Sequence, residues 1–129
     1  MPLSYAISDS ERLVRVNATG SVTSDDLPQM TSSLASDTKI VGGMRFLVEA
    51  ADVQPDLTFS DLRSAAGVLS ALNAKGVHEM AIVTDTTHVY ALAQVFAVFA
   101  PPSSVDVRVF RDRTEAMRWL DAGRGRAAS

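Results

Sequence analysis

The sequence of 129 residues contains no cysteine and only two histidines. The absence of cysteine excludes disulfide bonds, thiolate metal sites and cysteine nucleophiles. Two histidines leave little for a zinc site, so we expect neither a metal nor another cofactor. A chain without cysteine is typical of a reducing compartment, and we expect the protein to be cytoplasmic.

Long apolar runs and an excess of positive charge are also missing. The first residues, MPLSYAIS, lack the basic and apolar segments of a signal peptide, and the longest apolar stretch is too short for a membrane span. The net charge of −3 argues against nucleic acid, and we interpret the arginines from Arg108 onward as solvated surface. We therefore expect no membrane insertion and no nucleic-acid partner.

The chain does have the composition of an ordinary globular domain, with 47% hydrophobic and 21% charged residues. Its length suits one domain, which we place at residues 1–122, followed by a disordered tail at 123–129. Hydrophobic periodicity predicts strands at 3–7, 13–18, 44–50, 79–84 and 105–110, and helices that begin near 25 and span 58–74, 88–100 and 112–122. This order, β-β-α-β-α-β-α-β-α, predicts a largely parallel sheet with an antiparallel hairpin at its edge.

Proline and glycine decide several of the expected boundaries. We expect the first helix to start nearer Asp25 than Thr23, because Pro28 then lies in the first turn, where its missing N–H costs little. Residues 51–57 are predicted to form an unusually long loop, in which Pro55 blocks helix formation until Thr58. A glycine, Gly123, is expected to end the last helix.

Three segments carry a resemblance to a known family: RLVRVNATGSVTSDDL, EMAIVTD with the apolar helix after it, and the closing VFRDRTEAMRWL. Together they resemble the SpoIIAA-like proteins, a branch of the STAS superfamily of anti-sigma-factor antagonists. The resemblance covers residues 3–122. It implies an α/β fold with a five-stranded mixed sheet and flanking helices, in agreement with the order of elements above.

The resemblance implies less about activity. In the well-understood antagonists, a serine in an Asp-Ser-Ser-Gly-like turn, at the start of the helix after the third core strand, is phosphorylated to switch partner binding. The corresponding segment here, EAADVQPDLTFSDL, is longer and contains proline. Its nearest hydroxyls, Thr58 and Ser60, do not match that turn, so we transfer no phosphorylation site. The branch with this longer loop shares features with lipid-binding Sec14-type domains.

Charged residues are expected at the carboxyl ends of the parallel strands, where open α/β sheets bind ligands. Glu49, Asp85 and Asp112 could hold a hard cation there or take part in acid-base chemistry. The simpler interpretation is that Asp85 and Asp112 cap the helices that follow them. His88 could act as a base only beside a nucleophile or a water molecule, and we interpret it as a surface or cap histidine.

The predicted helix 88–100 is apolar on nearly every face. One stripe of large side chains is expected to face the core, whereas Tyr90, Ala91 and Val98 lie on other faces, and Gln94 is one of the few polar groups. The additional apolar surface has three explanations: burial against neighbouring helices, contact with a second subunit, or cover over an apolar ligand.

We therefore expect a non-enzymatic STAS-type domain that binds a protein partner, or itself as a homodimer, through this helix and the loop 51–57. The alternative is a small binding protein for an apolar or acyl ligand, held between this helix and residues 62–72. An enzyme that uses Asp85 and His88 is a third hypothesis. The candidate partner- or ligand-binding residues are Tyr90, Ala91, Gln94, Val98, Glu49, Asp85 and His88, the last three at the mouth of a ligand site.

Overall fold

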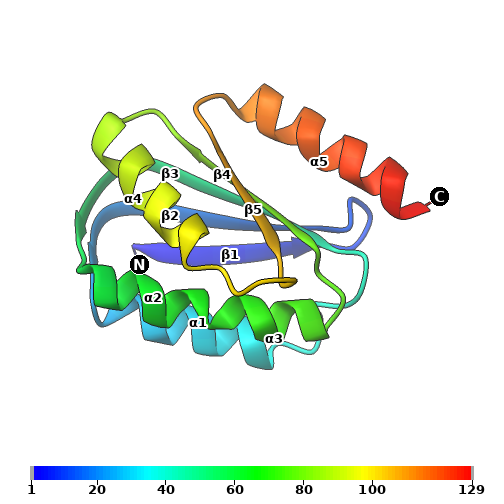
Figure 1. Ribbon diagram of the computed structural model, residues 1–129, viewed down its shortest axis with the longest axis horizontal. Helices are drawn as coiled ribbons and strands as arrows, with labels where there is room; N and C mark the ends of the chain where they lie inside the picture. Colours follow the sequence, from blue (N-terminus) through cyan, green and yellow to red (C-terminus); the bar gives the residue numbers. More distant parts are fainter. Residues whose placement is uncertain (1, 129) are drawn as a thin grey trace.

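Five strands form one sheet at the centre of the computed structural model, which describes residues 2–128 and the side chains of residues 2–122 (Figure 1). The strands are β1 (Leu3–Ser8), β2 (Leu13–Thr23), β3 (Arg45–Asp56), β4 (Glu79–Thr84) and β5 (Asp106–Phe110). They lie side by side in the order β1-β2-β3-β4-β5. β1 pairs with β2 in antiparallel orientation, and the other three pairs are parallel. This mixed sheet confirms the predicted fold class.

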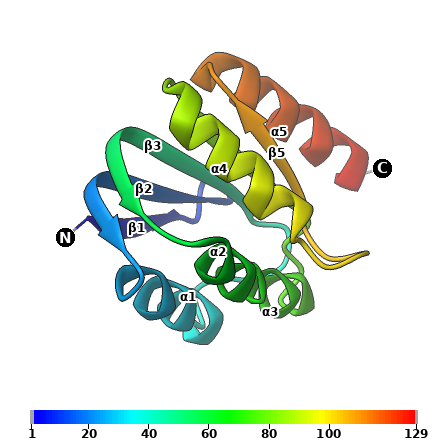
Figure 2. The same ribbon diagram turned by 60° about the vertical axis from the view of Figure 1, so that its left-hand side comes forward.

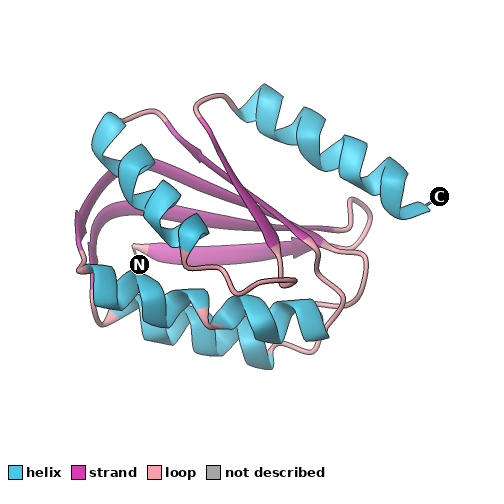
Figure 3. Cartoon of the chain, in the orientation of Figure 1, coloured by secondary structure: helices cyan, strands magenta, loops and turns pink. Residues whose placement is uncertain are grey.

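Helices cover the two faces of the sheet unequally, as Figure 3 shows. Four of them pack on one face and α5 packs on the other. The helices are α1 (Asp26–Ser36), α2 (Phe59–Ala66), α3 (Val68–Ala74), α4 (Thr87–Val98) and α5 (Arg113–Ala128). No helix within residues 2–128 combines the length and hydropathy that a membrane crossing needs.

The strand period of two divides the core between these faces. Val14 and Phe46 point towards α1, α3 and α4, whereas their sequence neighbours Leu13 and Leu47 point towards α5, and all four are fully buried. The sheet is therefore apolar on both sides where helices cover it. Beyond the reach of α5, the outward side chain of Asn17 on β2 is exposed, as the alternation predicts.

The prediction of a loop at 51–57 is wrong. β3 continues to Asp56 and β2 continues to Thr23, and the two extensions pair in parallel from Gly20 with Val53 to Thr23 with Asp56. Pro55 is tolerated because β4 leaves β3 after Ala50, so the strand beyond that point has an open edge. Figure 2 shows these two extensions bending away from the sheet towards α1 and α2.

The long helix predicted at 58–74 is divided into α2 and α3 at Gly67, whose N–H bonds to the carbonyl of Ser64 at 3.1 Å instead of four residues back. Its start at Thr58 is confirmed, because Thr58 and Asp61 form a capping box. Its end is also confirmed. Gly76 has a positive φ of 98°, and the Val77 N–H bonds to the Leu72 carbonyl at 3.0 Å, which together make a Schellman motif.

Helix starts are predicted better than helix ends. α1 has Asp25 at its N-cap and Pro28 in its first turn, as expected. The carboxylate of Asp112 accepts a bond of 2.6 Å from the Thr114 N–H and so caps α5. Thr86 rather than Asp85 occupies the N-cap of α4, so the expected capping role of Asp85 is wrong.

α5 also extends past Gly123 to Ala128, and the end expected at that glycine is wrong. Glycine costs only about 1 kcal/mol inside a helix, which a longer helix tolerates. The side chains of residues 123–129 lie outside the described part of the chain. The predicted disordered tail at 123–129 stays a prediction.

Candidate functional site

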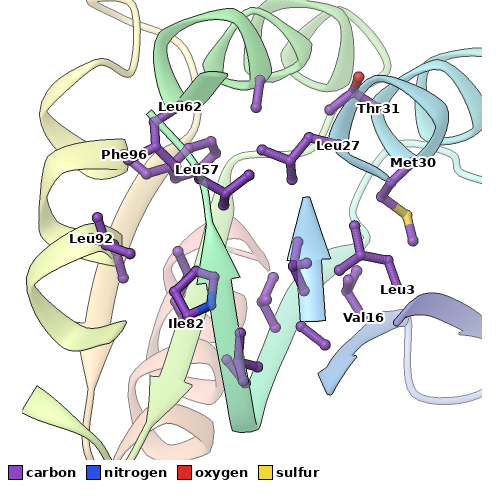
Figure 4. A pocket seen from close by; sticks show the side chains of 18 of the residues that line it. Leu3, Val16, Leu27, Met30, Thr31, Leu57, Leu62, Ile82, Leu92 and Phe96 are labelled. Carbon is purple, nitrogen blue, oxygen red and sulfur yellow. The ribbon is translucent and has the colours of Figure 1, made fainter. Parts of the chain in front are cut away.

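An apolar cavity of about 190 Å³ lies between the sheet and the four helices α1 to α4 that cover one of its faces (Figure 4). The floor consists of side chains from β2, β3 and β4 that point to the helical face of the sheet. α1 and α2 form one wall, and α4 forms the opposite wall with Leu92 and Phe96. Thr31 supplies the one hydroxyl group among the described side chains that line the cavity.

The cavity is large enough to hold a small organic group. Protein interiors contain few voids larger than a water molecule, and an apolar cavity of about 150 Å³ is sufficient to bind benzene. The walls offer a water molecule almost no polar partner, because Thr31 is the one polar residue among them. The cavity therefore suits a small apolar group better than it suits water.

A β-bulge brings the outer part of β3 into this cavity. The register between β2 and β3 shifts after Ala18 and Ala50, and Asp52 adopts a positive φ of 54°. This extra residue reverses the alternation, so that Val53 and Pro55 line the cavity while Asp52 is exposed. Without the bulge, an aspartate would point into the apolar space.

Part of the cavity rim lies where β2 and β3 end. Its deepest lining residues, such as Phe46 and Met80, are buried, whereas Leu27, Val53 and Leu57 near the strand ends are only half-buried. A second hollow, between α1 and α2, shares Leu27, Thr31 and Ala65 with the cavity. We call this part of the rim, built by the ends of β2 and β3 and the starts of α1 and α2, the mouth.

Hydrogen bonds fix the segments that surround the mouth. The hydroxyl of Ser24 donates to Asp61 at 2.8 Å, which joins the turn before α1 to the first turn of α2. The Thr58 N–H also donates to Asp61, at 2.8 Å, and this bond, with that from Ser24, lowers the pKa of the Asp61 carboxyl. Asp26 accepts from the N–H of Thr23 at 2.8 Å in the same way. The rim is thus acidic and ordered.

The candidate residues on α4 divide into two environments. Ala91, Gln94 and Val98 lie together on the outer surface of the helix, and Val98 is 81% exposed. Tyr90 is half-buried under the guanidinium of Arg111, which lies 4.4 Å from the centre of its ring. None of these four candidates lines the cavity.

The structure does not bring Glu49, Asp85 and His88 to the mouth. Glu49 follows Leu47 on the face of the sheet that α5 covers, and its carboxylate lies 3.7 Å from the guanidinium of Arg113. Asp85 and His88 are exposed, and neither lines the cavity. Among the described residues, no group of three or more His, Asp or Glu side chains is arranged to hold a metal ion.

The family model for SpoIIAA-like proteins matches residues 13–121 of the chain. The chain belongs to the SpoIIAA-like family. A solved structure similar to this SpoIIAA-like chain is an uncharacterized protein of the DUF3478 family with a SpoIIAA-like fold, from Shewanella loihica PV-4. The two share 19% sequence identity over 92% of this chain and 91% of the other, with a TM-score of 0.58, which supports the fold alone. A search of curated proteins finds no match.

Thr58 and Ser60 carry the hydroxyl groups of this SpoIIAA-like chain that lie nearest in the sequence to the position of the phosphorylated serine in the antagonists. The Thr58 hydroxyl accepts a bond of 3.1 Å from the Asp61 N–H in the capping box, and Ser60 is exposed on α2.

Sequence reasoning missed the residues that make the cavity. A signal was present in ADVQPDL, where Val53, Pro55 and Leu57 recur at every second position, the period of a strand.

Proposed function

We propose that this SpoIIAA-like domain is a non-enzymatic binding protein whose cavity holds an apolar ligand, an acyl or other hydrocarbon chain. The observation that supports this proposal is the cavity of about 190 Å³ with almost wholly apolar walls. The sequence alone favours partner binding through the predicted third helix and offers this function as the alternative.

The apolar walls of the cavity are unfavourable when nothing fills the space between them. Apolar surface left in contact with water forgoes about 25 cal/mol per Å² of hydrophobic stabilisation. An apolar ligand that fills the space recovers part of this energy and removes its own hydrocarbon surface from water. The cavity is therefore better explained as a ligand site than as a packing defect.

The chemistry of the walls also argues against catalysis inside the cavity. A nucleophile needs a base within hydrogen-bond distance, and general acid-base catalysis needs a titratable group near the reacting atoms. Thr31 is the one polar side chain among the described lining residues, and it has no such partner there. Binding without turnover fits this environment.

The proposal is tested by filling the cavity. Ala93→Leu places a larger side chain among the lining residues of α4, whereas Ala91→Leu makes the same change on its exposed surface. We expect Ala93→Leu to weaken binding of 1-octanol at least tenfold in a fluorescent-probe displacement assay, and Ala91→Leu to leave it unchanged. Equal affinities for both variants and the wild type would refute a ligand site in this cavity.

A second candidate function is association with another copy of the chain through the outer surface of α4. The observation that favours it is the 81% exposure of Val98, beside the exposed Ala91 and Gln94. If this surface forms a homodimer, Val98→Lys gives a monomer in sedimentation, whereas Ser70→Lys on the exposed side of α3 keeps the dimer. A wild-type monomer at high concentration excludes this function.

A further inference from the structure

A polar hollow adjoins the apolar cavity. It lies between α1 and α2, has a volume of about 190 Å³, and shares Leu27, Thr31 and Ala65 with the cavity. Unlike the cavity, it is lined largely by residues that carry a side-chain oxygen: Ser24, Thr31, Asp61 and Ser64. None of the described residues that line it is basic. A ligand whose hydrocarbon chain fills the cavity therefore has a polar site beside it.

Thr31 lies where the two spaces meet. It is half-buried, and it is the one polar residue among the three that line both the cavity and the hollow. Figure 4 shows its hydroxyl oxygen pointing away from the apolar side chains at the centre of the cavity, such as Leu57. A ligand that extends from the cavity towards the hollow therefore passes this oxygen.

The hydroxyl hydrogen of Thr31 is already used within α1. The Thr31 hydroxyl bonds to the carbonyl oxygen of Pro28 at 3.2 Å, and because a carbonyl oxygen only accepts, the hydrogen belongs to Thr31. The Oγ1 atom of Thr31 keeps lone pairs that can accept a further hydrogen bond. This atom is therefore suited to a ligand group that donates.

The other polar groups of the hollow have similar requirements. The Ser24 hydroxyl donates its hydrogen to Asp61 at 2.8 Å. The bonds from the Thr58 N–H and from Ser24 lower the pKa of the Asp61 carboxyl, so Asp61 is ionised at pH 7 and only accepts. The Ser64 hydroxyl forms no hydrogen bond with any residue that the structure describes, and it can donate or accept. The hollow thus offers several acceptors and one free hydroxyl.

This inventory distinguishes between head groups. A carboxylate only accepts, and it would bring a second negative charge near Asp61. An ester or an ether also only accepts, so neither can use Thr31. An ammonium group must exchange water for several acceptors, whereas Asp61 already receives two hydrogen bonds and lies in the first turn of α2, where the helix dipole favours its charge. A hydroxyl group both donates one hydrogen bond and accepts others.

We propose that the ligand is an uncharged alcohol, with its hydrocarbon chain in the cavity and its hydroxyl group donating to the Oγ1 atom of Thr31. This inference rests on the proposed apolar ligand site and adds the chemical class of the head group. The alcohol oxygen can in turn accept a hydrogen bond from Ser64. The chain then contacts apolar walls, and the hydroxyl group exchanges hydrogen bonds with water for hydrogen bonds with the protein.

The experiment compares 1-octanol with heptyl methyl ether, an isomer that has the same atoms but no hydroxyl hydrogen, by probe displacement at pH 7. We expect 1-octanol to bind about fivefold more tightly, within the range of one net hydrogen bond. Octanoate and octylamine should both bind more weakly than 1-octanol. If the ether binds as tightly as 1-octanol, or if octanoate or octylamine binds more tightly, the alcohol inference is wrong while the apolar site stands. If none of the four binds, both are wrong.

Variants of Thr31 locate the hydrogen bond. Thr31→Val replaces the hydroxyl group with a methyl group of similar size, so we expect it to bind 1-octanol about fivefold more weakly and the ether unchanged. Thr31→Ser keeps the hydroxyl group and should keep the preference for the alcohol. Thr38→Val serves as the control, because Thr38 lies in the exposed turn after α1 and lines neither space. A preference for 1-octanol that persists in Thr31→Val would contradict the role of Thr31.

Discussion

Replacing Gly76 with alanine tests how closely the chain packs where α3 returns to the sheet. Gly76 has a φ of 98°, and a Cβ atom built on it would lie 2.6 Å from the Cα of Gly42. The backbones cannot separate freely, because the Gly43 N–H donates to the Gly76 carbonyl at 3.1 Å. The left-handed conformation costs alanine about 1–2 kcal/mol, and the forced repacking costs about 1–3 kcal/mol more.

Gly20→Ala is the matched control for this substitution. Gly20 also has a positive φ, 69°, but a Cβ atom there would meet nothing within 4 Å. The control should lose only the conformational part, about 1–2 kcal/mol, whereas Gly76→Ala should lose about 2–5 kcal/mol. Urea unfolding followed by circular dichroism measures both values. Equal losses in the two variants would refute the close contact between Gly42 and Gly76.

Two further predictions concern caps and pH. Thr58→Ala should lower the free energy of unfolding, measured in urea, by about 1 kcal/mol because it removes the capping bond to Asp61. Thr86→Ala should lower it much less, because the Thr86 side chain makes no such bond. Equal losses in the two variants would contradict the capping box. The Tyr5 hydroxyl donates to Asp37 at 2.7 Å and lowers the pKa of that carboxyl below 3.8. The stability that this hydrogen bond contributes is therefore present above the pKa of Asp37 in the unfolded chain, and it is lost as the pH falls through the pKa in the folded chain. Tyr5→Phe should therefore be less stable than the wild type at pH 7, with a difference that narrows below about pH 4; a difference independent of pH between 7 and 2 would contradict this linkage.

Much of the fold could be predicted from hydrophobic periodicity and from the positions of proline and glycine. Val14, Val16 and Ala18 alternate with polar residues and indicate a strand with one buried face. The Schellman glycine, Gly76, marks the end of a helix because few other residues adopt its conformation. Such signals are local, so a single sequence is sufficient to find them.

The outer half of β3 could not be predicted in the same way. Pro55 argues against a strand in the middle of a sheet, and the bulge at Asp52 interrupts the alternation. Whether a proline is tolerated depends on where the neighbouring strand ends, which is a property of the assembled sheet. The sequence therefore predicts a loop for this segment, although it forms a wall of the cavity.

The cavity itself is a consequence of curvature and helix placement. Its lining residues, such as Leu62, Leu92 and Phe96, are indistinguishable in the sequence from tightly packed core residues. The volume left between them depends on the bend of β2 and β3 and on the distance between α4 and the pair α1 and α2.

The most direct test of the central claim, that the cavity binds an apolar chain, is a titration with 1-octanol followed by methyl NMR. We expect shifts in the methyl groups of Leu62, Ile82 and Leu92, which line the cavity. The methyl groups of Leu47 and Leu120, in the core beneath α5, should stay unchanged. Absence of shifts at the lining residues, or shifts confined to Val98 on the outer surface of α4, would contradict binding in the cavity.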